Sequence, residues 1–450
     1  MISGGPCGAR SLRSLRSNAR AARVACPRTR LVLAVIAVVA LPVAARAVAP
    51  TFSIDYVVTI GRRDPGRAHV RWLLAGIDEI EAMRLVFRDE RTTRVTGTGT
   101  LVWHDRTLLW TPGGPYAHLA YTVAIDRRRP PGAHFDSHAE GDWVATRALH
   151  LFPEINVRFR PGTVAAKSRA RLVFRLPRGW RVAAAARRLA DETFAVEEPA
   201  KRFDRPRGWF LLGRIARHSR LIAGLPVTVA VAPGSALDAR RLLRLYARTV
   251  PLLVSVLGPP PPRLLVVSAP DPMWHGGLSG EDSFFVNGHI PLRSADKTST
   301  YLHELFHVWQ PFRPKADGRW ISEGLAEYYS LALQHRAGRL SDRSFARGIR
   351  LFARYGRWGV DLSRTRQPAA LNNSAPLVMY WIDQEIRRVT DGRRTLDDAV
   401  HTLADERARL STASFLRAVN RTANRDFTPL FRRHVYRGER PPVAMIRAGN

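Results

Sequence analysis

Two histidines and a glutamate near residue 300 have types and spacing that could bind a metal ion and use it. His303 is followed directly by Glu304 and, four residues on, by His307. Residues four apart lie on one helix face, about 5–6 Å apart at their β-carbons. Two imidazoles there can reach one zinc ion at about 2.0–2.1 Å. Glu304 would project beside the metal, where a carboxylate can take a proton from a zinc-bound water molecule. The spacing predicts a zinc-dependent hydrolase, and the alternative is a chance match on an ordinary amphipathic helix.

A third ligand is expected from the next helix, because a hydrolytic zinc site needs three protein ligands and one open position. Residues 310–318 contain two prolines and a glycine, which predict a connecting loop. Ser322 is expected to cap the following helix, with Glu323 in its first turn as the ligand. Glu327, one turn later, is expected to hydrogen-bond the far nitrogen of a ligand histidine. The alternatives are an acid that merely favours a first helix turn, for Glu323, and a solvated acid, for Glu327.

The elements that must position these residues follow two different periodicities. From residue 51 to about residue 231, short segments alternate apolar and polar residues between Gly, Pro and Asp clusters, which predicts an antiparallel β-sandwich. Strands are expected at 52–60, 69–74, 99–103, 117–125, 170–176 and 227–231.

The period changes at residue 236. An amphipathic helix is expected over 237–257, ended by Gly258 and four prolines. Further elements are expected as buried strands at 264–267 and 283–286, and as helices at 377–388 and 396–406. The predicted organisation is a signal peptide or anchor at 1–50, a β-rich domain at 51–235, a catalytic domain at 236–340 and a helical domain with a tail at 341–450.

The first fifty residues have the order of a secretory signal. They are basic up to Arg30, apolar over 31–41, and then small, with Ala45-Arg46-Ala47 as a cleavage site. The apolar run is shorter than the about 20 residues of a membrane span. Cleavage on export to the periplasm or beyond is therefore favoured over a retained membrane anchor. Both cysteines, Cys7 and Cys26, precede the run, so a mature chain would contain no disulfide and no cysteine ligand.

The net charge is +33, and +25 remains when the eight arginines of residues 1–50 are set aside. An anionic partner is one interpretation, namely nucleic acid, acidic peptides, an acidic polymer or an anionic lipid surface. The arginines are scattered along the chain, whereas nucleic-acid footprints cluster. We therefore expect no specific nucleic-acid binding and at most weak association with anionic surfaces.

The segments 303–309 and 320–329 together resemble the gluzincin peptidases, most closely the glycyl aminopeptidase family. Weaker similarity to that family follows at 382–387, 391–398 and 427–438, so the resemblance runs from about Thr51 to Pro442. It implies a multidomain α+β fold with a β-rich N-terminal domain, a thermolysin-like zincin catalytic domain and a helical C-terminal domain. It also implies an aminopeptidase acting on peptides, with one zinc ion per chain.

By this resemblance, His303, His307 and Glu323 would be the ligands and Glu304 the general base. Gly276-Gly277-Leu278 is similar to the family's substrate-facing glycine segment, where an edge strand would pair with the substrate backbone. A simple turn is the alternative.

For the substrate's amino group, the resemblance points to Glu281 or Asp282, although the family's acid follows the glycines more closely. The family often carries a PDZ domain after its helical part, and this sequence is expected to lack it because it ends at Asn450.

One departure from the family bears on catalysis. The family usually carries a tyrosine that helps to stabilise the oxyanion, and counting back from Asp383 places Asn372 at that position. Asparagine can donate a hydrogen bond, with shorter reach, and losing one oxyanion donor costs roughly 10²–10³ in rate. Three outcomes stay open: a slow enzyme, another donor such as Tyr355 or Tyr380, or a zinc-binding relative that holds peptides or acts as a scaffold without cleaving them.

Overall fold

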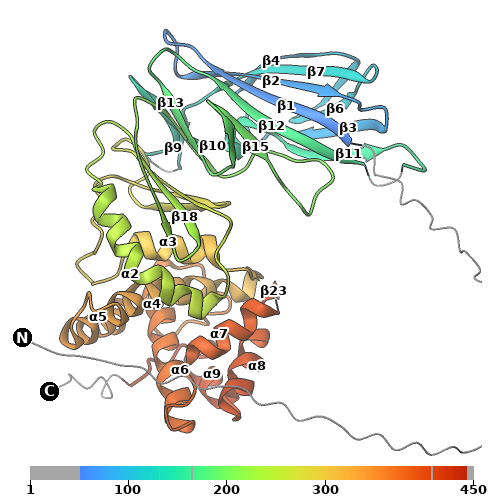
Figure 1. Ribbon diagram of the computed structural model, residues 1–450. Coiled ribbons are helices and arrows are strands. Elements are labelled where there is room, and N and C mark those ends of the chain that lie inside the picture. The colour runs from blue at the N-terminus through green and yellow to red at the C-terminus, as the bar shows by residue number, and fades with distance from the viewer. Residues whose placement is uncertain (1–50, 131, 164–165, 407–408, 443–450) are drawn as a thin grey trace, which may run out of the picture. The chain divides into compact units, whose positions relative to one another are not determined.

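The computed structural model describes residues 51–130, 132–163, 166–406 and 409–442, so the expected signal or anchor segment lies outside it. The N-terminal part of the described chain is built from β-strands and the C-terminal part from helices (Figure 1). The predicted combination of a β-rich N-terminal region and a helical C-terminal region is confirmed. None of the helices in these ranges is both long enough and apolar enough to cross a bilayer.

The strands of the N-terminal region form three sheets that share a core of alternating buried residues. The first has the order β14-β15-β12-β1-β2-β7-β4, the second β13-β16-β10-β9-β8 and the third β11-β3-β6-β5. The strands are β1 (Thr51–Ile60), β2 (Arg67–Ala75), β3 (Ile80–Val86), β4 (Thr92–Gly97), β5 (Thr100–His104), β6 (Thr107–Thr111), β7 (Tyr116–Ala124), β8 (Arg127–Arg128), β9 (Phe135–Glu140), β10 (Trp143–Arg147), β11 (Glu154–Phe159), β12 (Lys167–Arg175), β13 (Arg181–Ala184), β14 (Arg188–Ala190), β15 (Thr193–Val196) and β16 (Trp209–Gly213), with a short helix α1 (Ala148–Leu151).

The expectation of a wholly antiparallel sandwich is wrong at the centre of the largest sheet. Strands β1 and β12 pair in parallel, from Thr51 opposite Lys167 to Thr59 opposite Arg175. Alternation of apolar and polar residues reports that one face of a strand is buried, and it carries no information on the direction of the neighbouring strand. The two partners are more than a hundred residues apart, so no local turn signal identifies the pair either.

A separate five-stranded sheet, with the order β17-β18-β19-β21-β20, leads to the metal motif. Its strands are β17 (Ala216–Ile222), β18 (Leu225–Val231), β19 (Leu264–Ser268), β20 (Gly277–Gly280) and β21 (Ser283–Val286). Strands β18, β19 and β21 run parallel, and every residue of β19 and β21 is buried, as is typical of central strands. Strand β20 pairs only with β21 and is therefore an edge of the sheet.

Helix α2 (Ala239–Leu257) confirms the expected amphipathic helix and packs on β17 and β18. The carboxylate of Asp238 accepts a hydrogen bond from the backbone N–H of Arg241 and caps its start. Gly258 ends it with a positive φ of 79°. The later helices are α3 (Thr300–Trp309), α4 (Arg319–Arg336), α5 (Asp342–Tyr355), α6 (Ala375–Val389), α7 (Leu396–Asp405), α8 (Thr412–Ala423) and α9 (Thr428–Phe431), with the short turns η1 (Ala316–Gly318), η2 (Ala370–Ser374) and η3 (Arg432–Tyr436).

The loop between α3 and α4 is fastened to the C-terminal helical region. Strand β22 (Arg313–Pro314) pairs in parallel with β23 (Arg409–Leu410). The backbone N–H of Thr412 donates to the Asp317 carboxylate at 3.1 Å, and the indole of Trp320 donates to the Thr412 hydroxyl at 3.0 Å. These contacts set where α4 begins, and α4 carries the predicted third ligand.

Candidate metal centre

Helix α3 presents the two predicted histidines because its other residues are held in the core. Tyr301, Leu305 and Phe306 are fully buried, and α3 lies between the β20–β21 edge of the sheet and helix α4 (Figure 1). Ser299 occupies the N-cap position, as expected, but its side chain makes no capping hydrogen bond. Burial of one apolar face leaves His303 and His307 side by side on the face toward α4.

Helix α4 begins four residues earlier than the sequence predicts, so the expected cap at Ser322 is wrong. The turn η1 runs straight into α4, Gly318 is the N-cap, and Ser322 is a buried residue inside the helix. Its hydroxyl contacts the side-chain amide of Gln310 at 3.0–3.1 Å instead of a backbone N–H. The tertiary contacts of Asp317 and Trp320 with Thr412 override the local capping preference. Glu323 therefore lies in the second turn.

Close packing fixes α4 against its neighbours on both sides. The rings of Phe306 on α3 and Tyr329 on α4 stack at 5.4 Å with an interplanar angle of 12°. A β-carbon at Gly324 would lie 2.9 Å from the β-carbon of Ala375, so this glycine allows α4 and α6 to touch. The residue beside Gly324 is Glu323, and the same contacts therefore hold its position.

The structure brings His303, His307 and Glu323 together as a potential metal site. The Nε2 atoms of the two histidines are 3.0 Å apart, and a carboxylate oxygen of Glu323 lies 3.5 Å and 3.4 Å from them. Ligand atoms about 2.1 Å from a tetrahedral zinc are about 3.4 Å from one another. Two imidazoles with one carboxylate are also a ligand set of catalytic zinc sites, which keep the fourth position for water or substrate. The residues present therefore fit a zinc ion.

Further side chains orient the two histidines from behind. A carboxylate oxygen of Glu327 lies 2.6 Å from Nδ1 of His303, which is the hydrogen bond that the sequence predicts for it. On the other ring, Nδ1 of His307 faces the hydroxyl of Ser322 at 3.4 Å and the amide of Gln310 at 3.5 Å. Such contacts fix ring orientation, so that Nε2 of each histidine points to the shared centre.

The charges of the cluster are strongly coupled. Burial alone would lower the pKa of His303, but its hydrogen bonds to Glu323 and Glu327 raise that pKa well above the usual value. Burial would raise the pKa of Glu323, yet hydrogen bonds from both histidines hold it far below the usual range. Glu304 is the exception, since burial raises the pKa of its carboxyl group. The surroundings thus favour the charged form of Glu323 and disfavour the charged form of Glu304.

Glu304 is held under the edge strand β20. It is only 7% exposed, and a β-carbon built on Gly277 would lie 2.4 Å from its Oε1 and 2.6 Å from its Cγ. Two backbone carbonyls of strand β20 accept hydrogen bonds that hold the strand in place. The indole N–H of Trp209 donates to the carbonyl of Leu278 at 3.0 Å, and the guanidinium of Arg147 donates to the carbonyl of Ser279 at 3.1 Å. The absence of a side chain at Gly277 is what leaves room for the Glu304 carboxylate beside the histidines.

A cleft of about 560 Å³ opens over the metal cluster. Of the substrate residues expected from the sequence, Gly277 lines this cleft, on an edge strand as implied by the resemblance, and Asn372 lines it from the turn η2. The structure does not bring the others to it. The residues that do not line the cleft are Gly276, Glu281, Asp282, Tyr355 and Tyr380.

The reasons for these differences are local. Glu281 and Asp282 form the turn between β20 and β21, where they line another cavity with Arg207 and Arg263. Tyr355 is 56% exposed at the end of α5, and Tyr380 is buried in α6. The sequence offers Asn372, Tyr355 and Tyr380 as donors to the oxyanion. Of these three residues, Asn372 is the one that lines the cleft.

Sequence reasoning missed several residues that line the cleft. Trp274 could have been found from its place just before the glycines. Arg129 precedes it by more than a hundred residues, and Arg319 and Arg366 look like any other surface arginine in so basic a chain. Only the fold shows that these side chains meet.

Neither a known protein family nor a curated protein matches the sequence. Solved structures do match. An aminopeptidase N family protein from Idiomarina loihiensis has a TM-score of 0.69 and 14% identity, with 87% of this chain and 77% of that chain covered. An M1 zinc metallopeptidase from Deinococcus radiodurans, a mutant bound to a Tyr-Ser-Ala substrate, has a TM-score of 0.57 and 14% identity, with 89% and 96% covered.

A two-domain M1 zinc metallopeptidase mutant bound to L-tryptophan has a TM-score of 0.55 and 15% identity, with 88% of this chain and 95% of that chain covered. At this low sequence identity, the structural matches show a shared fold. The described chain therefore has the fold of these M1 zinc metallopeptidase structures.

Proposed function

We propose that this protein hydrolyses peptide bonds with one zinc ion held by His303, His307 and Glu323. The observation that carries the proposal is the convergence of these three ligand atoms within 4.8 Å of one another. A bound zinc ion would polarise the scissile carbonyl and lower the pKa of a water molecule. Peptide as the substrate class is supported by the similar structures with a tripeptide or an amino acid bound.

In this proposal Glu304 is the general base. It follows a ligand histidine directly and is buried beside the cluster, so it is placed to accept a proton from the attacking water and to pass it to the leaving amine. Glu327 keeps the ring of His303 oriented through its 2.6 Å contact. Gly277 leaves room for the base.

For the oxyanion we propose Asn372, whose side-chain amide can donate a hydrogen bond into the cleft from the turn η2. Its exposed position makes it a less preorganised donor than a group fixed in the core. An Asn372→Ala variant is expected to lose roughly 10²-fold in kcat. Unchanged kcat in that variant would remove Asn372 from the mechanism.

Further proposals concern aminopeptidase specificity, domain organisation and export. Aminopeptidase activity is supported by the likeness to the aminopeptidase N family protein from Idiomarina loihiensis. A thermolysin-like catalytic region over 236–340 is supported by β19, β20 and β21, which lead into α3 and α4, although β17 and β18 of the same sheet precede residue 236. Export, with removal of residues 1–50, is proposed from the sequence pattern alone. The β-rich region over 51–235 and the helical region from 341 onward are the matching domain proposals.

The decisive experiment uses a panel of peptides with free and with acetylated N-termini. Zinc-loaded protein without residues 1–50 is compared with its Glu304→Gln variant, which retains the ligands and loses the base. Cleavage of free peptides only, lost in the variant, supports a zinc aminopeptidase. Cleavage of both the free and the acetylated peptides supports a peptidase that does not require a free N-terminal amino group. Wild-type activity in the variant would refute the mechanism.

A zinc-binding relative that holds peptides without cleaving them is the second candidate. The observation in its favour is Asn372, which stands in the cleft where the resemblance implies a tyrosine. Full zinc occupancy without turnover of any peptide would select this candidate, and Asn372→Tyr would then be the first variant to test for restored activity.

A further inference from the structure

The cleft over the metal cluster continues into a second cavity. This second cavity of about 600 Å³ shares five lining residues with the cleft, including Arg319, Glu323 and Arg366. Residues of β20 line only the first cavity, whereas Lys315 and Arg364 line only the second. The groove therefore runs from the edge strand, past the ligands, into a region rich in cations.

The two arginines that line both cavities have no counter-charge among the described residues. No carboxylate of the described ranges forms an ion pair within 4.0 Å of Arg319 or Arg366. By contrast, Arg364 faces Asp361 at 3.5 Å, and on the β20 side Arg129 pairs with Asp136 at 3.2 Å. Lys315 of the second cavity likewise has no ion pair with a described carboxylate, so the unpaired positive charge extends from the shared part into the second cavity.

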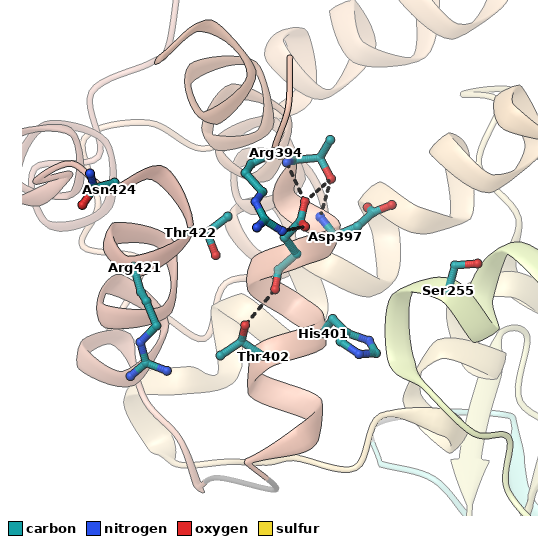
Figure 2. Close-up of a pocket in the computed structure, with 10 residues that line it drawn as sticks. Ser255, Arg394, Asp397, His401, Thr402, Arg421, Thr422 and Asn424 are labelled. Atoms are coloured by element: carbon teal, nitrogen blue, oxygen red, sulfur yellow. Dashed lines mark hydrogen bonds and ion pairs between the residues drawn. The ribbon is translucent and has the colours of Figure 1, made fainter. Parts of the chain in front are cut away.

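The arginines of another pocket differ from Arg319 and Arg366, because acids of the chain pair with them. Figure 2 shows the pocket at the start of α7, where Arg394 pairs with Asp398 at 2.9 Å. Arg421 of the same pocket pairs with Glu406 at 2.8 Å. Acids of the chain thus pair with both arginines of that pocket, whereas Arg319 and Arg366 beside the metal cluster have no such acid among the described residues.

The acids that line the two cavities cannot supply the missing charge. Glu304 and Glu323 belong to the metal cluster, and a carboxylate oxygen of Asp317 accepts the backbone N–H of Thr412 at 3.1 Å. Arg319 precedes Glu323 by one helical turn on the same face of α4, so its charge lies next to a ligand. A substrate that crosses the ligands reaches these guanidinium groups on the side away from β20.

Building on the peptidase function proposed above, we propose that the cleft selects peptides with a carboxylate on that side of the cleaved bond, bound by Arg319 and Arg366. A guanidinium fork matches a carboxylate with two parallel hydrogen bonds. The carboxylate could come from an acidic side chain or from the free C-terminus of a short peptide, because both present the same group. An exposed pair of this kind contributes about 0.2–1 kcal/mol, which corresponds to a preference of up to about fivefold for each arginine.

The test measures binding, so that it does not depend on turnover. Zinc-loaded Glu304→Gln protein is titrated in a calorimeter with three peptides of one length: a neutral peptide amide, the same amide with one aspartate, and the neutral peptide with a free C-terminus. Tighter binding of the second peptide identifies an acidic side chain, and tighter binding of the third identifies the terminal carboxylate. The preference should weaken as salt is raised.

Arg319→Gln and Arg366→Gln are each expected to reduce the affinity ratio of acidic to neutral peptide, and Arg421→Gln is the control that removes one positive charge elsewhere. Equal binding of all three peptides, or an equal loss of the ratio in the control, would overturn the proposal. Arg366 lies in an exposed loop, so its variant remains informative if a change at the start of α4 disturbs folding. Failure of the peptidase proposal would show separately, as absence of cleavage by the wild-type protein.

Discussion

Replacement of Gly277 by alanine tests whether Glu304 must occupy its present position. The new β-carbon would lie 2.6 Å from Cγ and 2.7 Å from Cδ of Glu304. Carbon atoms pack at about 3.5–4.0 Å, so either the carboxylate or the strand has to move by about 1 Å. Glu304 is buried, and no rotation into solvent relieves the overlap.

A misplacement of this size at a reacting group can cost about 10²-fold in rate, or about 2.7 kcal/mol of transition-state stabilisation. We therefore expect Gly277→Ala to lower kcat/KM by about that factor while zinc content stays at one per chain, because the three atoms nearest to the new β-carbon all belong to Glu304 and none to a proposed ligand. The assay is peptide hydrolysis with parallel zinc analysis.

The control for this experiment is Gly61→Ala, whose β-carbon would meet nothing within 4 Å. It reports the general effect of the same substitution far from the cleft. If Gly277→Ala folds, binds zinc and retains the wild-type kcat/KM, then the position of Glu304 does not limit the reaction, and the assignment of the base is refuted.

Three other predictions concern metal affinity and stability. Glu327→Gln should weaken zinc binding by about 10–100-fold, because it replaces the carboxylate behind His303; competition with a chelator measures this, and unchanged affinity would contradict it. His150 is buried near several arginines, and burial lowers its pKa to about 2. The unfolded chain protonates this residue near pH 6.5 and the folded chain does not, so stability should fall by about 1.4 kcal/mol per pH unit below that point. His150→Asn should remove this part of the slope in urea titrations at several pH values, and an unaltered slope would exclude His150 as its source. Asp238→Ala should cost about 1 kcal/mol of unfolding free energy at neutral pH through loss of the α2 cap. The hydrogen bond from the backbone of Arg241 lowers the pKa of Asp238, so the difference between variant and wild type should vanish as the pH falls through that lowered value, and a difference that persists in acid would refute the cap as its origin.

The zinc motif could be predicted because its information is local. The interval of four residues between His303 and His307 sets their common helix face whatever the rest of the fold does. The position of Glu327 behind His303 follows from the same periodicity on α4, once Glu323 is taken as the ligand. These predictions needed only the geometry of a helix.

Prediction from the sequence failed where contacts between residues far apart in the chain determine the structure. The start of α4 depends on Asp317 and Thr412, which are 95 residues apart, and so the local preference of Ser322 for a cap was misleading. The parallel pairing of β1 with β12 is likewise invisible to a pattern of alternation. The arginines of the cleft could not be separated from the many that face solvent, because their chemistry depends on which acids are absent around them.

The fastening of the α3–α4 loop to the C-terminal region has a consequence for biosynthesis. The ribosome delivers His303 and His307 about a hundred residues before Leu410 and Thr412, which position the start of α4 through β22–β23 and the Asp317 contact. A nascent chain therefore contains His303 and His307 long before the contacts that help to position Glu323 can form. If Glu323 is a zinc ligand as proposed, a chain that ends before Leu410 would lack part of the support for this ligand and is expected to bind zinc more weakly.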